Sequence, residues 1–569
     1  MKTKFAANSM LGFIKKHALL ILSALLAIIS FLLCAYYIIF PAQGYLHSDC
    51  TDSLLWANAS VESGKVFDDN FRYAAMLPFG ASLWFIPLIQ LFGYSMTAQT
   101  VGMLIFLLFF SLAAYFMCRS LKWSHTASFC MISALLLMLS GSDKLREIMW
   151  GHVIYYSLAL LIIMVEIGLC ARLSTSLSDA LSPQCEKKKL AIIKSSIYAL
   201  LIFILFTGNG TNGFQLIAIS SLAVFAAIFA ERFFDGSTKI FSKKNIPAAL
   251  NLALIIVSSI IGLVILDALK GDKFANYTTI YSSFSKLGDW YANFASFFES
   301  YFSLIGVSVK GGEPLFAKES IPSLVRIVGG VILLVVPVVT LFRYKHIKEQ
   351  STKILLWTHL AVSVVIMVGF ICGRLGNANW RITPMVGTAI MATVAAIREL
   401  LLAIKNKERS SFGAVQFRIG LLICAVLIAF SAVNANDIRR MPKNYGRNNS
   451  LHQLADTLEE KGLEYGYATF WRSQAITLLS DSNVKCRETL VNSNGVITDY
   501  YQSSRLWYED QEGIDKYFVI LSTSEYETVS KTSHWKNIMR TSYVEHFECA
   551  GYQVYVFDEN IILLGEFEG

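Results

Sequence analysis

The sequence predicts a polytopic α-helical membrane protein with about eleven transmembrane helices, followed by a C-terminal extracytoplasmic α/β domain. Of its 569 residues, 54% are hydrophobic and only 16% are charged, and the mean hydropathy is +0.50. Apolar runs of helix-spanning length, or slightly less, recur through residues 1–433. The hydropathy then drops, which separates residues 434–569 as a second domain.

Eleven apolar runs define the expected spans, of which the third and fifth are short. They are Ala18–Phe40, Thr97–Cys118, Thr126–Ser140, His152–Ala171, Ser195–Thr207, Gly213–Ala230, Ala248–Leu266, Pro322–Phe342, Ile354–Gly373, Ile382–Ile404 and Val415–Val433. A further apolar stretch, Met76–Gly93, is interrupted by Pro78, Gly80 and Pro87. We expect it to form an interfacial or re-entrant helix, because a twelfth span would invert every later loop.

The distribution of basic residues sets the expected orientation in the plasma membrane. With the N-terminus in the cytoplasm, Lys and Arg before residue 434 concentrate in the cytoplasmic loops. This positive-inside pattern also accounts for the net charge of +8 without a nucleic-acid partner. The first span reads as a signal anchor, and an odd number of spans places residues 434–569 outside.

The tail alternates helical and strand patterns. Helices are expected at Asn449–Lys461 and Arg472–Ser480. Strands are expected at Tyr465–Phe470, Val484–Val491 and Lys516–Leu521, followed by a hairpin of Tyr543–Glu548 and Tyr552–Asp558. The ten cysteines show no metal-binding spacing. A disulfide between Cys486 and Cys549 is left open.

Two carboxylates follow the first span, in the first long outer loop (residues 41–93). If Ser48–Ser60 is helical, Asp49, Asp52 and Trp56 share one face. A carboxylate there can take a proton from an attacking hydroxyl group, and its neighbour can raise its pKa. The alternative is that these acids simply favour the helix N-terminus, with Ser48 as the cap.

Later outer loops carry further candidates. Asp143 and Glu147, with His152 beyond them, can bind a divalent cation or a phosphate oxygen, or form an ordinary solvated turn. Arg374 and Arg381 bracket an outer loop that contains Asn379, and their guanidinium groups suit phosphate oxygens. Contact with anionic lipid headgroups is the alternative. The second long outer loop (267–321) holds an aromatic stretch, Asn276–Phe302, that suits an interfacial helix.

The first outer loop resembles that of the GT-C superfamily of membrane glycosyltransferases, which includes protein mannosyltransferases and aminoarabinose transferases. The resemblance lies in Asp52-Ser-Leu-Leu-Trp56-Ala57, Leu77-Pro78 and Leu91-Phe92-Gly93, and covers mainly residues 1–170. The tail segment Gly466–Trp471 is similar to extracytoplasmic domains of Gram-positive members. Ser53 replaces the second acid of the family's usual doublet, so Asp49 is a second candidate for its role.

The resemblance implies inverting transfer of a sugar from a polyprenyl-phosphate donor, at the outer face of the lipid bilayer, to a glycan, teichoic acid or protein acceptor. Asp52 or Asp49 would be the general base, and Trp56, Arg374, Arg381, Asn379 and His152 would bind substrate. Mg²⁺ or Mn²⁺ at Asp143 and Glu147 is the candidate cofactor, although no clear acidic pair follows Asp143. A transporter or flippase for a lipid-linked glycan, or a non-catalytic cell-envelope assembly protein, is the alternative. The identities of the sugar and acceptor, the oligomeric state and the role of the tail stay open.

Overall fold

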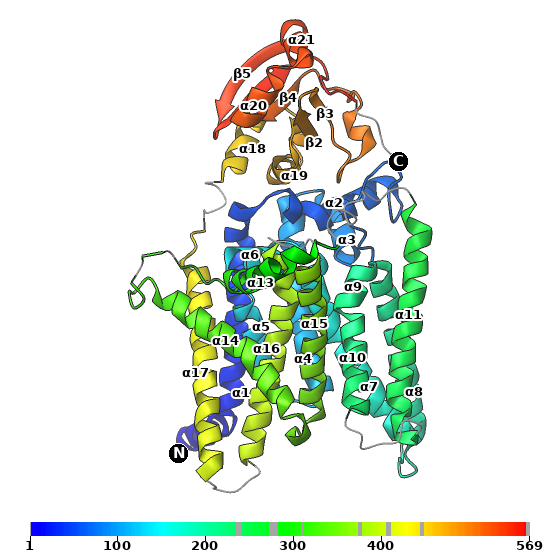
Figure 1. The fold of residues 1–569 in the computed structure, drawn as a ribbon, viewed down its shortest axis with the longest axis vertical. Coiled ribbons are helices and arrows are strands. Elements are labelled where there is room, and N and C mark those ends of the chain that lie inside the picture. The colour runs from blue at the N-terminus through cyan, green and yellow to red at the C-terminus, as the bar shows by residue number, and fades with distance from the viewer. Residues whose placement is uncertain are drawn as a thin grey trace.

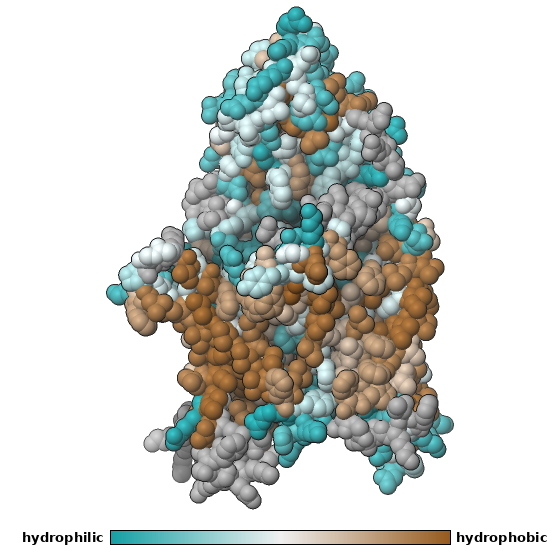
Figure 2. All heavy atoms as spheres, in the orientation of Figure 1, coloured by the Kyte–Doolittle hydropathy of each residue, from teal (hydrophilic) through white to brown (hydrophobic). Residues whose placement is uncertain are grey.

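A computed structural model describes residues 2–234, 242–271, 283–309, 311–312, 314–373, 378–405, 411–443 and 449–564. Within these ranges, ten helices are long and apolar enough to cross a membrane. They stand side by side in a bundle, and the tail domain lies beyond one end of it (Figure 1). On the face shown in Figure 2, apolar residues cover the bundle, whereas the tail is largely hydrophilic and hydrophilic residues also lie at the opposite end. The predicted fold class, a polytopic helical membrane protein with a C-terminal domain, is confirmed.

Every expected span corresponds to a helix. The long helices are α1 (Lys2–Ile39), α4 (Met96–Ser120), α7 (Tyr155–Leu181), α8 (Lys188–Thr211), α11 (Ile246–Lys270), α14 (Ile321–Phe342), α15 (Gln350–Cys372), α16 (Thr383–Lys405) and α17 (Ser411–Arg440). The tenth is broken at Ser220 into α9 (Phe214–Ile219) and α10 (Ser221–Phe233). The third expected span, Thr126–Ser140, corresponds to α5 (His125–Met138), whose 14 residues are too few to count among the ten.

Small residues allow close approach within the bundle. Helices α8 and α11 cross where Gly210 meets Gly262, and a Cβ atom added to Gly262 would lie 2.6 Å from the Gly210 Cα. Small residues are typical of such contacts in membranes, because apolar helix surfaces gain little by leaving lipid and must pack tightly instead. All ten cysteine thiols are free, including those of Cys486 and Cys549.

Short elements form a layer between the bundle and the tail. It contains η1 (Pro41–Tyr45), α2 (Ser48–Ser63), α3 (Ser82–Phe92), α6 (Asp143–Arg146), η2 (Glu147–Gly151), α13 (Trp290–Leu304) and η6 (Asn379–Ile382). In Figure 1, α2, α3, α6 and α13 lie at the end of the bundle that faces the tail. Met76–Gly93 thus forms no span: its helix α3 has 11 residues and contains Pro87. The aromatic helix α13 begins at Trp290, and residues 276–282 of the expected helix lie outside the described ranges.

The tail is an α/β domain built on a six-stranded sheet of order β3-β2-β1-β4-β6-β5. Its strands are β1 (Tyr465–Ala468), β2 (Lys485–Asn492), β3 (Gly495–Thr498), β4 (Tyr517–Leu521), β5 (Tyr543–Cys549) and β6 (Tyr552–Phe557). Strand β1 pairs in parallel with β2 and β4, and the other pairs are antiparallel. The expected hairpin turns through Ala550 and Gly551, both with positive φ.

Two tail helices match the sequence-based expectation, and two further helices do not follow from it. Helices α18 (Ser450–Glu460) and α19 (Phe470–Leu479) were expected, whereas α20 (Thr523–Val529), α21 (Ser533–Thr541) and strand β3 were not. α20 and α21 are short, and Gly495 begins a strand of only four residues. Helix α17 continues to Arg440 and α18 begins at Ser450, so the domain boundary at residue 433 stays a prediction.

The tail is bonded directly to the first outer loop. Arg72 N donates to the Ser503 carbonyl at 3.0 Å, and Arg505 N donates to the Asn70 carbonyl at 2.8 Å. The Phe71 ring meets the Trp507 ring edge to face, with centroids 5.7 Å apart. These contacts fix the position of the tail over α2.

Candidate active site at the membrane–tail junction

Helix α2 carries the first set of predicted site residues. It begins at Ser48, with His47 as its N-cap, and ends where Gly64 adopts a φ of +67°. The interpretation of Ser48 as the cap is therefore wrong, and no side chain caps this helix. Asp52 and Trp56 are buried, whereas Asp49 is half-buried. A helix that is buried on most sides yet carries a carboxylate needs a polar partner for it.

That partner comes from the tail. Gln502 Nε2 donates to Asp52 Oδ1 at 2.9 Å, and Trp56 Nε1 donates to Gln502 Oε1 at 2.8 Å. Gln502 is 1% exposed and Asp52 is 8% exposed. One amide therefore joins two of the predicted site residues, which lie one turn apart on α2, to a loop 450 positions later in the chain.

The electrostatic environment of Asp52 favours its protonated form. Burial, followed by the negative charge of Asp49, raises the pKa of Asp52 well above its usual range. The Gln502 hydrogen bond and the nearby His47 act in the opposite direction. A carboxylate with a raised pKa is a stronger base once ionised, which suits proton abstraction from a hydroxyl group.

A second buried carboxylate, Glu147, lies at the start of η2 beside three basic side chains. Its Oε1 atom lies 3.1 Å from His47 Nε2 and 2.6 Å from Lys144 Nζ. His152 is also buried, with Nε2 3.8 Å from the same oxygen. Burial alone would raise the pKa of Glu147, but the two histidines hold it below its usual range.

His47 links the two carboxylates. Burial opposes its charged form, but Cys50 and Glu147 raise the pKa of His47 to about 11. On its outer side, the His47 ring packs against Trp471 of the tail, with centroids 5.8 Å apart. The charged imidazolium therefore lies between the first outer loop, the loop that carries Glu147 and the tail.

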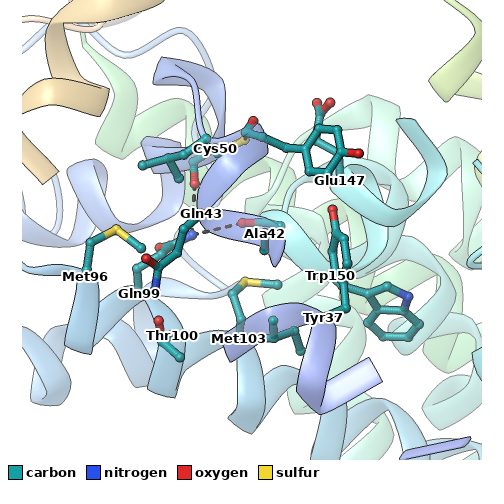
Figure 3. A pocket seen from close by; sticks show the side chains of 14 residues that line it. Tyr37, Ala42, Gln43, Cys50, Met96, Gln99, Thr100, Met103, Glu147 and Trp150 are labelled. Atoms are coloured by element: carbon teal, nitrogen blue, oxygen red, sulfur yellow. Dashed lines mark hydrogen bonds between the residues drawn. The ribbon is translucent and has the colours of Figure 1, made fainter. Parts of the chain in front are cut away.

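The structure places the two predicted metal ligands in different surroundings. Asp143 is ion-paired with Arg146, and its side chain is 60% exposed. Glu147 instead lies with His47 and Cys50, and one potential ligand atom from each falls within 4.8 Å of the others. Cys50 and Glu147 also line a cavity of about 20 Å³ (Figure 3), which is room for a single water or ion.

The later predicted residues lie around η6. Asn379 Nδ2 donates weakly to Ser303 Oγ at 3.4 Å, and Arg381 interacts with the Tyr156 hydroxyl group at the start of α7. Lys144 Nζ lies 4.6 Å from the centre of the Trp380 ring, and this contact connects η6 to α6. Arg374 lies outside the described residues.

Two larger cavities lie beside α2 and α3. One, of about 390 Å³, is lined by Trp56, Lys65, Pro78, Leu83 and neighbouring residues. The other, of about 410 Å³, has an almost wholly apolar lining from α3, α4, α7 and α8. Leu83 lines both, so the mixed cavity beside Trp56 adjoins the apolar one.

Comparison with known proteins gives a likeness of fold. No protein-family model matches the chain, and no curated protein matches its sequence. The structure of ArnT from Cupriavidus metallidurans bound to undecaprenyl phosphate is similar to it, with a TM-score of 0.48 and 10% identity, over 96% of this chain and 99% of that chain. The apo structure of the same protein gives a TM-score of 0.47 and 11% identity, over 97% and 98%. A likeness at this level is too weak to assign an activity.

The residues that sequence reasoning missed are Gln502, His47 and Cys50. His47 and Cys50 flank Asp49 in the printed sequence, so their place beside α2 was open to inspection. Gln502 carries no such signal, because it lies in a loop between β3 and β4 and belongs to no motif. Only its φ of +54°, unusual for a residue with a side chain, marks the position, and that angle needs a structure.

Proposed function

We propose that this protein is a membrane glycosyltransferase that moves a sugar from a polyprenyl-phosphate donor to a cell-envelope acceptor. The observation that carries the proposal is the position of Asp52. It is a buried carboxylate at the outer end of an apolar helical bundle, held by Gln502 and one turn from Trp56. Trp56 in turn lines the mixed cavity that adjoins the apolar cavity.

The two cavities match the two parts of such a donor. An isoprenoid chain needs an apolar channel. The apolar cavity between α3, α4, α7 and α8 offers one. Its sugar phosphate needs a polar space near the membrane surface, which the cavity beside Trp56 and Lys65 offers. Entry past Leu83 would bring the anomeric carbon toward α2, with the sugar against the Trp56 ring.

In the proposed step, the ionised Asp52 carboxylate accepts the proton of an acceptor hydroxyl group. The hydroxyl oxygen forms a bond to the anomeric carbon from the face opposite the phosphate. The bond between that carbon and the phosphate oxygen breaks, and its electron pair leaves with the polyprenyl phosphate. Attack from the opposite face inverts the configuration. Asp49 is half-buried beside the base and assists by raising its pKa.

We assign neutralisation of the departing phosphate to basic residues of the outer loops. Arg381 of η6 is a candidate, because it contacts Tyr156 at the outer start of α7. Arg374 remains a candidate from the sequence. Asn379 and His152 are proposed substrate contacts as well, although His152 is buried against Glu147 and would reach substrate only after a rearrangement.

The donor atoms present fit a divalent cation other than the one expected. Mg²⁺ and Mn²⁺ prefer oxygen ligands, whereas His47, Cys50 and Glu147 offer nitrogen, sulfur and oxygen, a set more typical of Zn²⁺. Lys144 already neutralises Glu147, so a cation there would have to displace it. Metal analysis of the purified protein, with Cys50→Ser as the comparison, tests this assignment.

The proposed activity is tested by sugar transfer in membranes. Radiolabelled polyprenyl-phosphate sugars are supplied to membranes that contain the wild-type protein, Asp52→Asn or Asp49→Asn at equal expression. Loss of a positioned base lowers rates by roughly 10²–10⁴, so Asp52→Asn should abolish detectable transfer and Asp49→Asn should reduce it less. Asp143→Asn, at an exposed ion pair, is the control.

Two results would contradict the proposal. Full transfer by Asp52→Asn would remove the proposed base. No transfer by the wild-type protein from any donor, together with changed movement of a lipid-linked glycan across the membrane, would favour the transporter.

A further inference from the structure

We propose that Gln502 of the C-terminal domain is a positioning residue of the transferase site, holding the Asp52 carboxylate in place from outside the membrane. This inference rests on the proposed function, and it gives the tail domain a role in that site. The supporting observation is the chain of two hydrogen bonds from Trp56 through Gln502 to Asp52.

The chemistry of the partners fixes which way the Gln502 amide points. An indole N–H only donates, so it requires the amide oxygen, and an ionised carboxylate only accepts, so it requires the amide nitrogen. If the amide were reversed, its nitrogen would face the Trp56 N–H group and its oxygen would face the Asp52 carboxylate. Neither pair could form a hydrogen bond. The hydrogen bond from Gln502 therefore opposes the protonation of Asp52 that burial and Asp49 favour. Because Gln502 occupies Oδ1, the second carboxylate oxygen is left for the acceptor hydroxyl group.

The loop that carries Gln502 is held on both sides. Within the tail, Ser503 Oγ donates to the Asp499 carbonyl at 2.6 Å, and the Tyr508 hydroxyl donates to the Glu488 carbonyl at 2.9 Å. Toward the membrane, the Ser503 carbonyl accepts from Arg72 N at 3.0 Å. These bonds support a left-handed backbone at Gln502 that costs energy in a residue with a side chain. Such strained positions are concentrated at functional sites.

Asp52 faces charged and titratable groups from several elements. Asp49 on the same helix and Glu488 on β2 are acidic neighbours, and burial and Asp499 raise the pKa of Glu488, whereas His47 lowers the pKa of Asp52. The Tyr94 and Tyr155 phenols also lie within electrostatic reach of Asp52. Gln502 is neutral, so replacing it leaves every charge in place and isolates the effect of the two hydrogen bonds that its amide makes.

The test uses the full-length protein reconstituted in lipid nanodiscs, and compares wild type with Gln502→Met and Gln502→Asn. Met keeps the length of the side chain without its hydrogen bonds. Asn keeps the amide and tolerates the left-handed backbone. The control is Ser482→Ala. It removes a different hydrogen bond of the tail, which Ser482 Oγ donates at 2.6 Å to the carbonyl of Tyr94, just after the first outer loop.

The expected result is a shift of the acidic limb of the pH profile of kcat/KM. Without the donated hydrogen bond, Gln502→Met should move this limb up by about one to two pH units. The kcat should fall about tenfold with little change in KM for the donor, because the substrate contacts are retained. Gln502→Asn should shift the acidic limb less than Gln502→Met does, and Ser482→Ala should leave the limb at its wild-type position.

An unshifted limb in folded Gln502→Met would overturn the inference, even if activity fell. Higher activity would overturn it too, because Gln502 would then be occupying the place of the acceptor. Failure of the proposed function looks different, since Asp52→Asn would remain as active as wild type or no variant would transfer sugar. Thermal unfolding of each variant shows whether a loss of activity comes from loss of fold.

Discussion

Asp52 and Glu147 are both buried carboxylates in the layer between the bundle and the tail, and their surroundings act on them in opposite ways. Burial and the nearby Asp49 raise the pKa of Asp52, and the hydrogen bond from the neutral Gln502 amide opposes this rise without cancelling it. Glu147 meets Lys144 and two histidines, and its pKa is lowered. Burial alone therefore does not decide the charge of a carboxylate here; the partner does. Opposed pKa shifts within one site commonly separate a reacting group from a structural one.

The largest expected difference between the two residues is in turnover. If Asp52 is the base and Glu147 a structural anion, Asp52→Asn should lower kcat by roughly 10²–10⁴, whereas Glu147→Gln should lower it far less. The measurement is steady-state sugar transfer by the two purified variants, corrected for the folded fraction. Equal losses in both would erase the distinction between them.

The next effect concerns stability and its dependence on pH. Because the folded pKa of His47 is about 11, above its ordinary 6.5, its charge stabilises the fold fully below pH 6.5. That contribution is lost as the pH rises toward 11. Glu147→Gln removes the anionic partner, so it should cost about 1–3 kcal/mol near neutral pH and flatten this dependence.

Thermal unfolding of both proteins between pH 6 and pH 10 checks the sign. This range starts below the ordinary pKa of His47, 6.5, and rises toward its folded value of about 11. A wild-type protein that gains stability on going to high pH would contradict the assignment of the charge to His47. Asp143→Asn should retain the wild-type pH dependence, because its ion pair with Arg146 is exposed on the carboxylate side.

A smaller effect is expected from Lys144, whose side chain is 30% exposed. Its replacement by Met should cost about 0.2–1 kcal/mol, as for most solvent-accessible ion pairs, and the loss should shrink at high salt. Unfolding measured at low and high ionic strength tests this. A loss as large as that of Glu147→Gln would mean that Lys144, rather than His47, is the main partner of Glu147.

The smallest effect is expected at Asn379. Its one 3.4 Å hydrogen bond to Ser303 is exposed, so Asn379→Ala should change stability by no more than about 0.5 kcal/mol. A clear fall in transfer at unchanged stability would show that Asn379 contacts substrate. That outcome would extend the reacting part of the site from α2 to η6.

Much of the fold followed from hydropathy, because lipid imposes one rule on every span. Long apolar runs had to become helices, and interruptions such as Pro87 had to shorten one. The tail was harder, since a four-residue strand such as β3 leaves little periodicity to detect. The sequence signal for α20 is the capping box of Ser522 and Glu525. This signal is short, and a search for longer periodic patterns does not detect it.

The site was predictable only where its residues are close in sequence. Asp49, Asp52 and Trp56 share a helix, so their spacing alone suggested a common face. The pairing of Glu147 with His47, and of Asp52 with Gln502, depends on how separate loops pack above the bundle. No local pattern encodes such contacts, because they arise from tertiary structure.

The sequence separation of 450 positions between Asp52 and Gln502 also has a consequence for biosynthesis of the protein. During synthesis, α2 emerges near the beginning, and its partner loop emerges only near the end. The proposed base would therefore stand without its amide partner through nearly the whole of membrane insertion. A chain terminated before β1 would lack Gln502 and would still contain the ten spanning helices of the described ranges. On the proposed mechanism, such a chain would be inserted but catalytically immature, so activity would report completion of translation and folding of the tail.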